Sequence, residues 1–117
     1  MISKELLSEI FDWKVKFVNP RINDDEVSFI DYNGNRDSFN VYYVAHKCKE
    51  WAYKKGFSVN SRYWNDMLGS AELFDVLWSP PKGSMFICDA DTEVEAIFKA
   101  CEWILYNKDK HDNKDSN

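Results

Sequence analysis

The segment from Val41 to Lys55 predicts a helix with one apolar face, and this pattern constrains the fold more than any other feature of the chain. Asn40 can accept a hydrogen bond from the first turn, and Gly56 favours the end of the helix. The apolar positions recur at intervals of three and four residues: Val41, Val44, Ala45, Cys48, Trp51 and Ala52. Such a helix must bury its apolar face against another layer.

A second predicted helix, from Glu93 to about Tyr106, has a wider apolar arc. Thr92 and Glu95 have the spacing of a capping box at its start. The arc is about twice the stripe of roughly 100° that a surface helix needs, which predicts burial on two sides. We expect a sheet on one side and the helix 41–55 on the other, with Ala96 and Ala100 allowing close approach. The alternative neighbour is the same helix of another subunit in a twofold dimer.

The remaining periodicity predicts strands, together with a short first helix capped by Ser3. Asn33-Gly34 indicates a hairpin turn, whereas 63–70 is expected to be a loop. The expected strands are 13–17, 26–32, 36–39, 57–62, 71–78 and 84–88.

The order of these elements predicts an α+β fold. We expect a small antiparallel sheet with helices on one face, in an α-β-β-β-α core (about 40–106) preceded by an N-terminal helix and β-hairpin. Residues 1–106 would form a single domain. Residues 107–117 contain no apolar side chain and are expected to form a disordered C-terminal tail.

Length, charge and hydropathy limit the classes of function. The 117 residues suit one domain. The net charge of −5 argues against broad nucleic-acid binding, which depends on neutralising phosphates. No apolar run reaches the roughly 18 residues that span a bilayer, and no signal peptide is evident, so we expect no membrane contact and a cytoplasmic location.

No catalytic, metal or cofactor site is expected. His46 and Cys48 lie on different sides of the predicted helix, so they cannot form a nucleophile–base pair or a paired set of zinc ligands. The odd number of cysteines, three, favours small core residues over a disulfide framework. The acids before and within the first turn of the helix 93–106 suit the helix dipole. A small enzyme is therefore the least supported class.

Two segments, 44–52 (VAHKCKEWA) and 92–104 (TEVEAIFKACEWI), resemble small proteins encoded in phage and prophage regions. Some of these are described as phage ABA-sandwich domains, and the resemblance covers about 40–106. It implies an accessory phage protein and no catalytic residues. Double-stranded RNA-binding domains share the α-β-β-β-α order, but the four acids within 89–95 would repel RNA.

Two sets of residues are candidates for partner binding. Tyr42, His46, Lys49 and Tyr53 form a stripe beside the polar face of the first long helix. The stripe suits an acidic or aromatic-rich partner, or it is solvated, or the N-terminal hairpin packs over it.

The second set lies where the predicted strand 57–62 ends and the predicted loop 63–70 begins. Arg62, Tyr63 and Trp64 are of the residue types that contribute most to interface energetics. The alternative is that Trp64 folds back over the edge of the sheet.

These features together predict a non-enzymatic accessory protein of phage or mobile-element origin that binds a host or phage protein. Of the two oligomeric states considered, we expect the monomer rather than the homodimer. The alternative is a nucleic-acid-associated accessory protein that uses the basic helix 41–55. The segment 40–62 has five Lys or Arg residues and one acid, a charge of +4, whereas 89–106 has five acids and one Lys, a charge of −4.

Deleting residues 108–117 should leave the melting temperature nearly unchanged, because the deleted segment has no apolar side chain to contribute to the core. Circular dichroism melts of the full chain and the truncated chain check this. A large decrease on truncation would contradict the expected tail.

Overall fold

The computed structural model describes residues 2–19, 25–65, 68–75 and 86–115. Helices and strands follow one another along the chain in an order close to the expected one. They are α1 (Lys4–Phe11), β1 (Val15–Val18), β2 (Glu26–Asp31), β3 (Arg36–Asn40), α2 (Val41–Lys54), β4 (Phe57–Asn65), β5 (Leu68–Asp75), β6 (Phe86–Ala90) and α3 (Glu93–Asp115).

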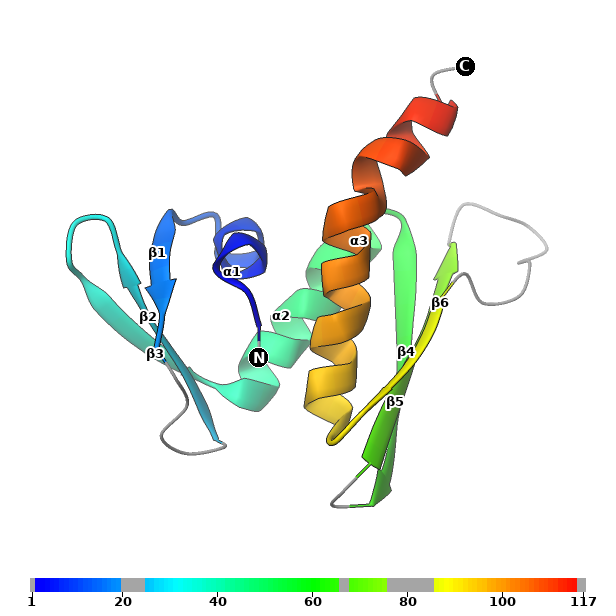
Figure 1. Cartoon of the computed structure of the whole chain (residues 1–117), viewed down its shortest axis with the longest axis horizontal. Coiled ribbons are helices and arrows are strands. Elements are labelled where there is room, and N and C mark those ends of the chain that lie inside the picture. The colour runs from blue at the N-terminus through cyan, green and yellow to red at the C-terminus, as the bar shows by residue number, and fades with distance from the viewer. Residues whose placement is uncertain (1, 20–24, 66–67, 76–85, 116–117) are drawn as a thin grey trace.

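The described strands form two antiparallel sheets, with the helices between them (Figure 1). The first sheet has the order β1-β2-β3 and the second the order β4-β5-β6. Helix α3 covers one face of the second sheet and contacts its three strands, and α2 contacts both α3 and β4. The α+β class is confirmed, but the N-terminal strands form a sheet of their own instead of joining or covering the main sheet.

Local capping interactions fix the starts of the helices as the sequence predicts. The Ser3 hydroxyl accepts from the Leu6 N–H at 3.1 Å, and the Asn40 side chain accepts from the Tyr42 N–H at 2.9 Å. At α3, the Thr92 hydroxyl accepts from the Glu95 N–H at 3.1 Å. These bonds satisfy backbone donors that have no partner inside the helix.

Helix α3 is buried on two sides, as its wide apolar arc predicts. On one side the Cys101 thiol donates to the Cys48 carbonyl of α2 at 3.6 Å. On the other, the Trp103 ring stacks on Phe86 of β6 with centroids 5.3 Å apart. The intramolecular neighbour is therefore α2, as expected. Ala96, however, lies on the sheet side of α3: it is seven residues, about two turns, before Trp103, and its carbonyl accepts from the Cys88 thiol of β6 at 3.3 Å.

The far end of α3 differs from expectation. The helix continues to Asp115, beyond the end at Tyr106 that the apolar pattern predicts. The last turns project past both sheets in Figure 1. Hydrogen bonding within a helix needs no apolar face, and the pattern used to place the end depends on that face alone.

Strand β4 also extends further than expected. Residues 63–65 and 68–70 pair across a hairpin, so the loop predicted over 63–70 is wrong for these residues. Of the strand expected over 71–78, residues 76–78 lie outside the described residues, as does the turn expected over 79–83. Gly69, expected to mark a loop, instead allows close packing: a Cβ there would collide with the backbone of Glu93 at the start of α3.

An aromatic cluster joins α1 to the first sheet and to the start of α2. Phe11 of α1 stacks on Phe39 of β3 with centroids 4.8 Å apart, and Phe39 lies 5.6 Å from Tyr43 of α2. Trp13 and Phe29 complete the cluster. These contacts hold the first sheet on the opposite side of the helices from the second sheet.

Trp51 and Ile97 belong to one core, with 6% and 4% of their surface exposed. Replacing either residue by Ala should lower the free energy of unfolding by about 2–5 kcal/mol, because each change leaves a cavity. Tyr53→Ala on the outer face of α2 is the control and should stay within about 0.5 kcal/mol. Urea unfolding measures all three, and losses below about 1 kcal/mol at both core positions would contradict this packing.

The turn between β2 and β3 should depend on pH through Asp31. Its carboxylate accepts from the backbone N–H of Asn35 at 2.9 Å and of Asn33 at 2.8 Å. These bonds, that of Asn35 above all, hold the pKa of Asp31 below its usual value of 3.8. A lowered folded-state pKa adds stability above the unfolded value, and this is lost as pH falls through the folded value.

We therefore expect the Asp31 carboxyl carbon to titrate by NMR with a midpoint below 3.8. The difference in free energy of unfolding between the wild type and Asp31→Asn should shrink as the pH falls below 3.8. A titration midpoint at or above 3.8 would show that the turn does not favour the charged form of Asp31.

Candidate functional site

The α2 stripe, defined as Tyr42, His46, Lys49 and Tyr53, lies on the face of α2 opposite the core. Tyr42 and Tyr53 are 67% and 66% exposed, and the His46 side chain is also exposed. Lys49 is half-buried. This exposure contradicts the alternative in which the N-terminal strands pack over the stripe. Solvation and partner binding remain as its two interpretations.

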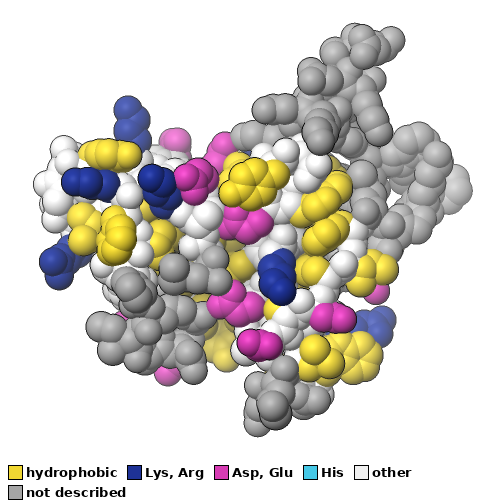
Figure 2. Space-filling model, viewed as in Figure 1, with side chains coloured by type: hydrophobic (Ala, Val, Ile, Leu, Met, Phe, Trp, Pro, Cys, Tyr) yellow, Lys and Arg dark blue, Asp and Glu magenta, His cyan; other side chains and the backbone are white. Residues whose placement is uncertain are grey.

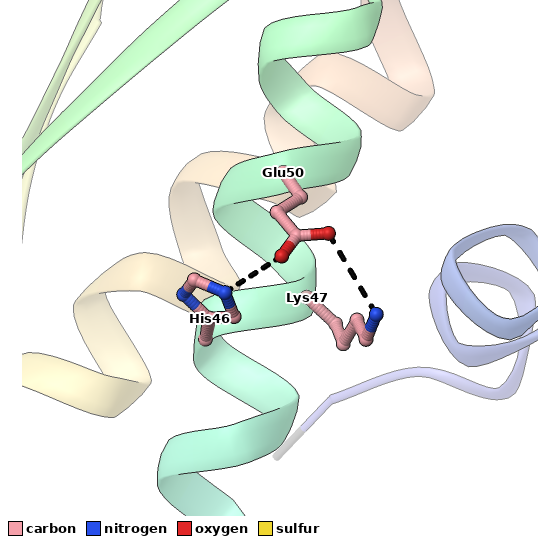
Figure 3. A network of polar contacts seen from close by, with 3 residues as sticks. All are labelled: His46, Lys47 and Glu50. Atoms are coloured by element: carbon pink, nitrogen blue, oxygen red, sulfur yellow. Dashed lines mark ion pairs between the residues drawn. The ribbon is translucent and has the colours of Figure 1, made fainter.

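His46 belongs to a small polar network on the surface of α2 (Figure 3). Its Nε2 lies 2.6 Å from one Glu50 carboxylate oxygen, and the other oxygen lies 3.7 Å from the Lys47 ammonium. Lys47 also lies over the Tyr43 ring, 5.6 Å from its centroid. Glu50 therefore restrains His46 at the centre of the stripe and holds Lys47 on another side of the helix.

The cysteines face away from this network. Cys48 and Cys101 are fully buried, and burial raises the pKa of the Cys48 thiol well above its usual value of 9.0. Burial also raises the pKa of Cys88, which packs against the edge of the core. Thiolate is the reactive form of cysteine, so a buried protonated Cys48 is not available to His46 on the outer face of the helix.

The β4 surface, defined as Arg62, Tyr63 and Trp64, lies on a strand and not on the expected loop. Tyr63 and Trp64 are 62% and 55% exposed. The Trp64 indole N–H donates to the Ser70 hydroxyl of β5 at 2.9 Å, and the Arg62 guanidinium lies 6.0 Å from the Trp64 ring. Trp64 thus leans across the sheet, as the second interpretation expects, while more than half of the side chain stays exposed.

The face of the second sheet that carries Trp64 is the one that α3 does not cover. Residues whose side chains point to α3, such as Ala71 and Leu73, are fully buried, whereas Ile87 on the outer face is 61% exposed. Strand pairing aligns Arg62 with Ser70, and Ser70 with Asp89. Arg62 and Trp64 are therefore part of a mixed polar and apolar sheet face, whereas Tyr63, which is aligned with Gly69, alternates to the face on which α3 packs.

The structure also shows a hollow that sequence reasoning missed. A cavity of about 740 Å³ is lined by α1, the start of β1, the turn that follows β2 and residues 105–106 of α3. Exposed aromatic rings of Trp13, Tyr32 and Tyr106 line it together with polar residues of α1. Figure 2 shows hydrophobic side chains in two groups on this view of the molecule, with charged side chains between them. The lining comes from three distant segments, so no local pattern could reveal it.

Among the described residues, no three side chains of the types that bind metals lie close enough to hold an ion. Of the described helices, none combines the length and the apolar character needed to cross a membrane. Comparison of the chain with family models, curated proteins and solved structures gave no match. The resemblance to phage-encoded proteins therefore stays a prediction.

Proposed function

We propose that the protein is a non-enzymatic binding module that acts in the cytoplasm and engages another protein through the β4 surface. The observation that carries this proposal is the restraint on Trp64, which is held by Ser70 while more than half of its surface stays open. Arg, Tyr and Trp dominate the energetics of protein interfaces. A side chain held in its bound conformation loses less entropy on binding.

The charge on the proposed surfaces indicates the chemistry of the partner. Arg62 on the β4 surface and Lys49 on the α2 stripe are cations on a chain whose net charge is −5. A partner with acidic groups around an apolar recess would receive Trp64 and pair with Arg62. Complementary charges of this kind raise association rates and select among partners. The phage resemblance adds the proposal that the partner is a host protein.

Nucleic-acid binding is the second candidate, and the lysines of α2 favour it. Lys47, Lys54 and Lys55 lie on one side of the helix, lining a single hollow with Lys47 half-buried and the other two exposed. Phosphate contacts through lysines would make binding strongly dependent on salt. Contacts through aromatic anchors would not show the same dependence.

Affinity capture from host lysate, followed by purification of the captured protein, tests the proposal. We expect the doubly substituted Tyr63→Ala, Trp64→Ala variant to bind that protein at least roughly 25-fold more weakly, since loss of an interface hot spot costs about 2 kcal/mol or more. Phe17→Ala is a matched control, because Phe17 is an aromatic residue 50% exposed on the first sheet. Thermal melts confirm that each variant is folded.

Two results would contradict protein binding through the β4 surface. One is equal loss of affinity with Phe17→Ala. The other is binding that disappears after nuclease treatment or falls steeply between about 50 and about 200 mM salt, which would support nucleic acid. The double variant Tyr42→Ala, Tyr53→Ala shows in parallel whether the α2 stripe contributes.

A further inference from the structure

The cavity of about 740 Å³ beside α1, called the α1 hollow, shares no residue with the β4 surface. Helix α1 forms one of its walls and lies between the first sheet and α3 (Figure 1). The rings of Trp13, Tyr32 and Tyr106 line the α1 hollow from three separate segments of the chain. The volume is within the range of roughly 300–1,000 Å³ that is usual for small-molecule sites.

The Trp13 ring is supported by the aromatic cluster. Its centroid lies 6.0 Å from that of Phe11 and 5.7 Å from that of Phe29. The Trp13 backbone N–H donates to the Ser8 carbonyl at 3.1 Å, which fixes the chain where it leaves α1. Even so, 42% of Trp13 stays exposed where it lines the α1 hollow. A flat ring that is already held in place loses little entropy when a ligand stacks on it.

Two tyrosines add further exposed rings to the same cavity. Tyr32 directly follows β2, in a turn where the Asp31 carboxylate accepts from the Asn33 backbone N–H at 2.8 Å. Tyr106 lies on α3, and the two tyrosines are 65% and 69% exposed. A ligand that covers these rings would remove apolar surface from water, which favours binding.

The polar lining argues against a ligand with a single net charge. Glu5 and Asp12 contribute carboxylates, whereas Lys4 and Lys14 contribute ammonium groups, and all four residues are exposed. Glu9 also lines the α1 hollow, but it already has an interaction partner and is not needed in this argument. A lone cation or a lone anion would be attracted by one pair and repelled by the other. A neutral ligand with both hydrogen-bond donors and acceptors would suit both pairs.

We propose that the α1 hollow binds a neutral saccharide of one or two pyranose rings, with one ring stacked on Trp13. One face of a pyranose ring carries mainly C–H groups, which suit the negative face of an aromatic ring. Its hydroxyl groups donate to the carboxylates of Glu5 and Asp12 and accept from the ammonium groups of Lys4 and Lys14.

A proline-rich peptide is the nearest alternative, because such segments also dock on exposed aromatic rings. Proline has no backbone N–H, so a run of prolines offers carbonyl acceptors and no donors. It would satisfy the lysines of the α1 hollow and leave the carboxylates of Glu5 and Asp12 without a partner. The mixed polar lining therefore favours the saccharide.

NMR titration of the full-length ¹⁵N-labelled protein tests this proposal. The probes are maltose, cellobiose and N,N′-diacetylchitobiose, and sorbitol is the control because it has hydroxyl groups but no ring face. The indole N–H signal of Trp13, identified by its disappearance in Trp13→Phe, reports binding. We expect it to shift and saturate with at least one disaccharide, at a concentration at least roughly tenfold below that needed for sorbitol.

Two further measurements test the contacts and the neutrality of the ligand. Saturation of the aromatic protons of the protein should transfer to the C–H protons of the bound sugar, because these lie against the rings. The dissociation constant should change by less than about twofold between about 50 and about 200 mM salt, because screening weakens interactions between charges and the ligand has none.

Variants connect binding to the α1 hollow. The double variant Tyr32→Ala, Tyr106→Ala removes two exposed rings and should weaken disaccharide binding roughly tenfold. Glu5→Ala removes one acceptor and should weaken it roughly fivefold, as expected for the loss of one hydrogen bond. Tyr42→Ala is the matched control, because Tyr42 is an equally exposed tyrosine on the α2 stripe, and it should leave the titration unchanged. Thermal melts confirm that each variant is folded.

Three results would overturn the proposal. If no disaccharide shifts the Trp13 signal at lower concentration than sorbitol does, the α1 hollow is not a saccharide site. If tetramethylammonium saturates the signal at lower concentration than every disaccharide, the rings serve as a cation site. If an acetylated and amidated triproline peptide does so, the cavity is a peptide groove. None of these results bears on protein binding through the β4 surface, because the two sites share no residue.

Discussion

The fold depends on the burial of α3 on two sides. One side packs on the second sheet through Trp103 and Ala96, and the other contacts α2 at Cys101. At its outer edge Glu102 accepts hydrogen bonds from the backbone N–H and the hydroxyl of Ser3, both at 2.9 Å, which ties the start of α1 to α3. Because α1 and α2 carry the first sheet, α3 connects the two halves of the molecule.

This arrangement determines which surfaces stay open. With the helices between the sheets, the inner face of each sheet contributes to the core, while described side chains on the outer faces, such as Ile87, are exposed. Helix α2 is divided in the same way, since its inner face reaches α3 and β4 while the α2 stripe points outward. Exposed aromatic side chains such as Trp64 and Tyr53 are therefore consequences of the topology, and the hydrogen bond to Ser70 fixes the position of the Trp64 ring.

Local signals in the sequence predicted the helices and most of the strands, because caps and turns act over a few residues. Asn40, Thr92 and Gly56 each occupy the capping or terminal position that their chemistry favours. Interactions between distant segments were not predictable in this way. Gly69 looked like a loop residue because its purpose, the close approach of Glu93, lies outside any local window. The separate first sheet and both hollows depend on the same kind of long-range contact.

The candidate site residues show the same contrast between features that local patterns predict and features that depend on contacts between distant segments. The α2 stripe could be found from helical periodicity, and its exposure followed from the opposite face being apolar. Trp51 was correctly assigned to the core for that reason, but periodicity says nothing about its indole N–H. Leaving such a donor buried and unpaired costs about 1–3 kcal/mol, which the apolar contacts of the rest of the side chain must offset. Whether that N–H meets an acceptor is decided by which segments pack around it, α1 among them, and such contacts between distant segments lie outside any local pattern.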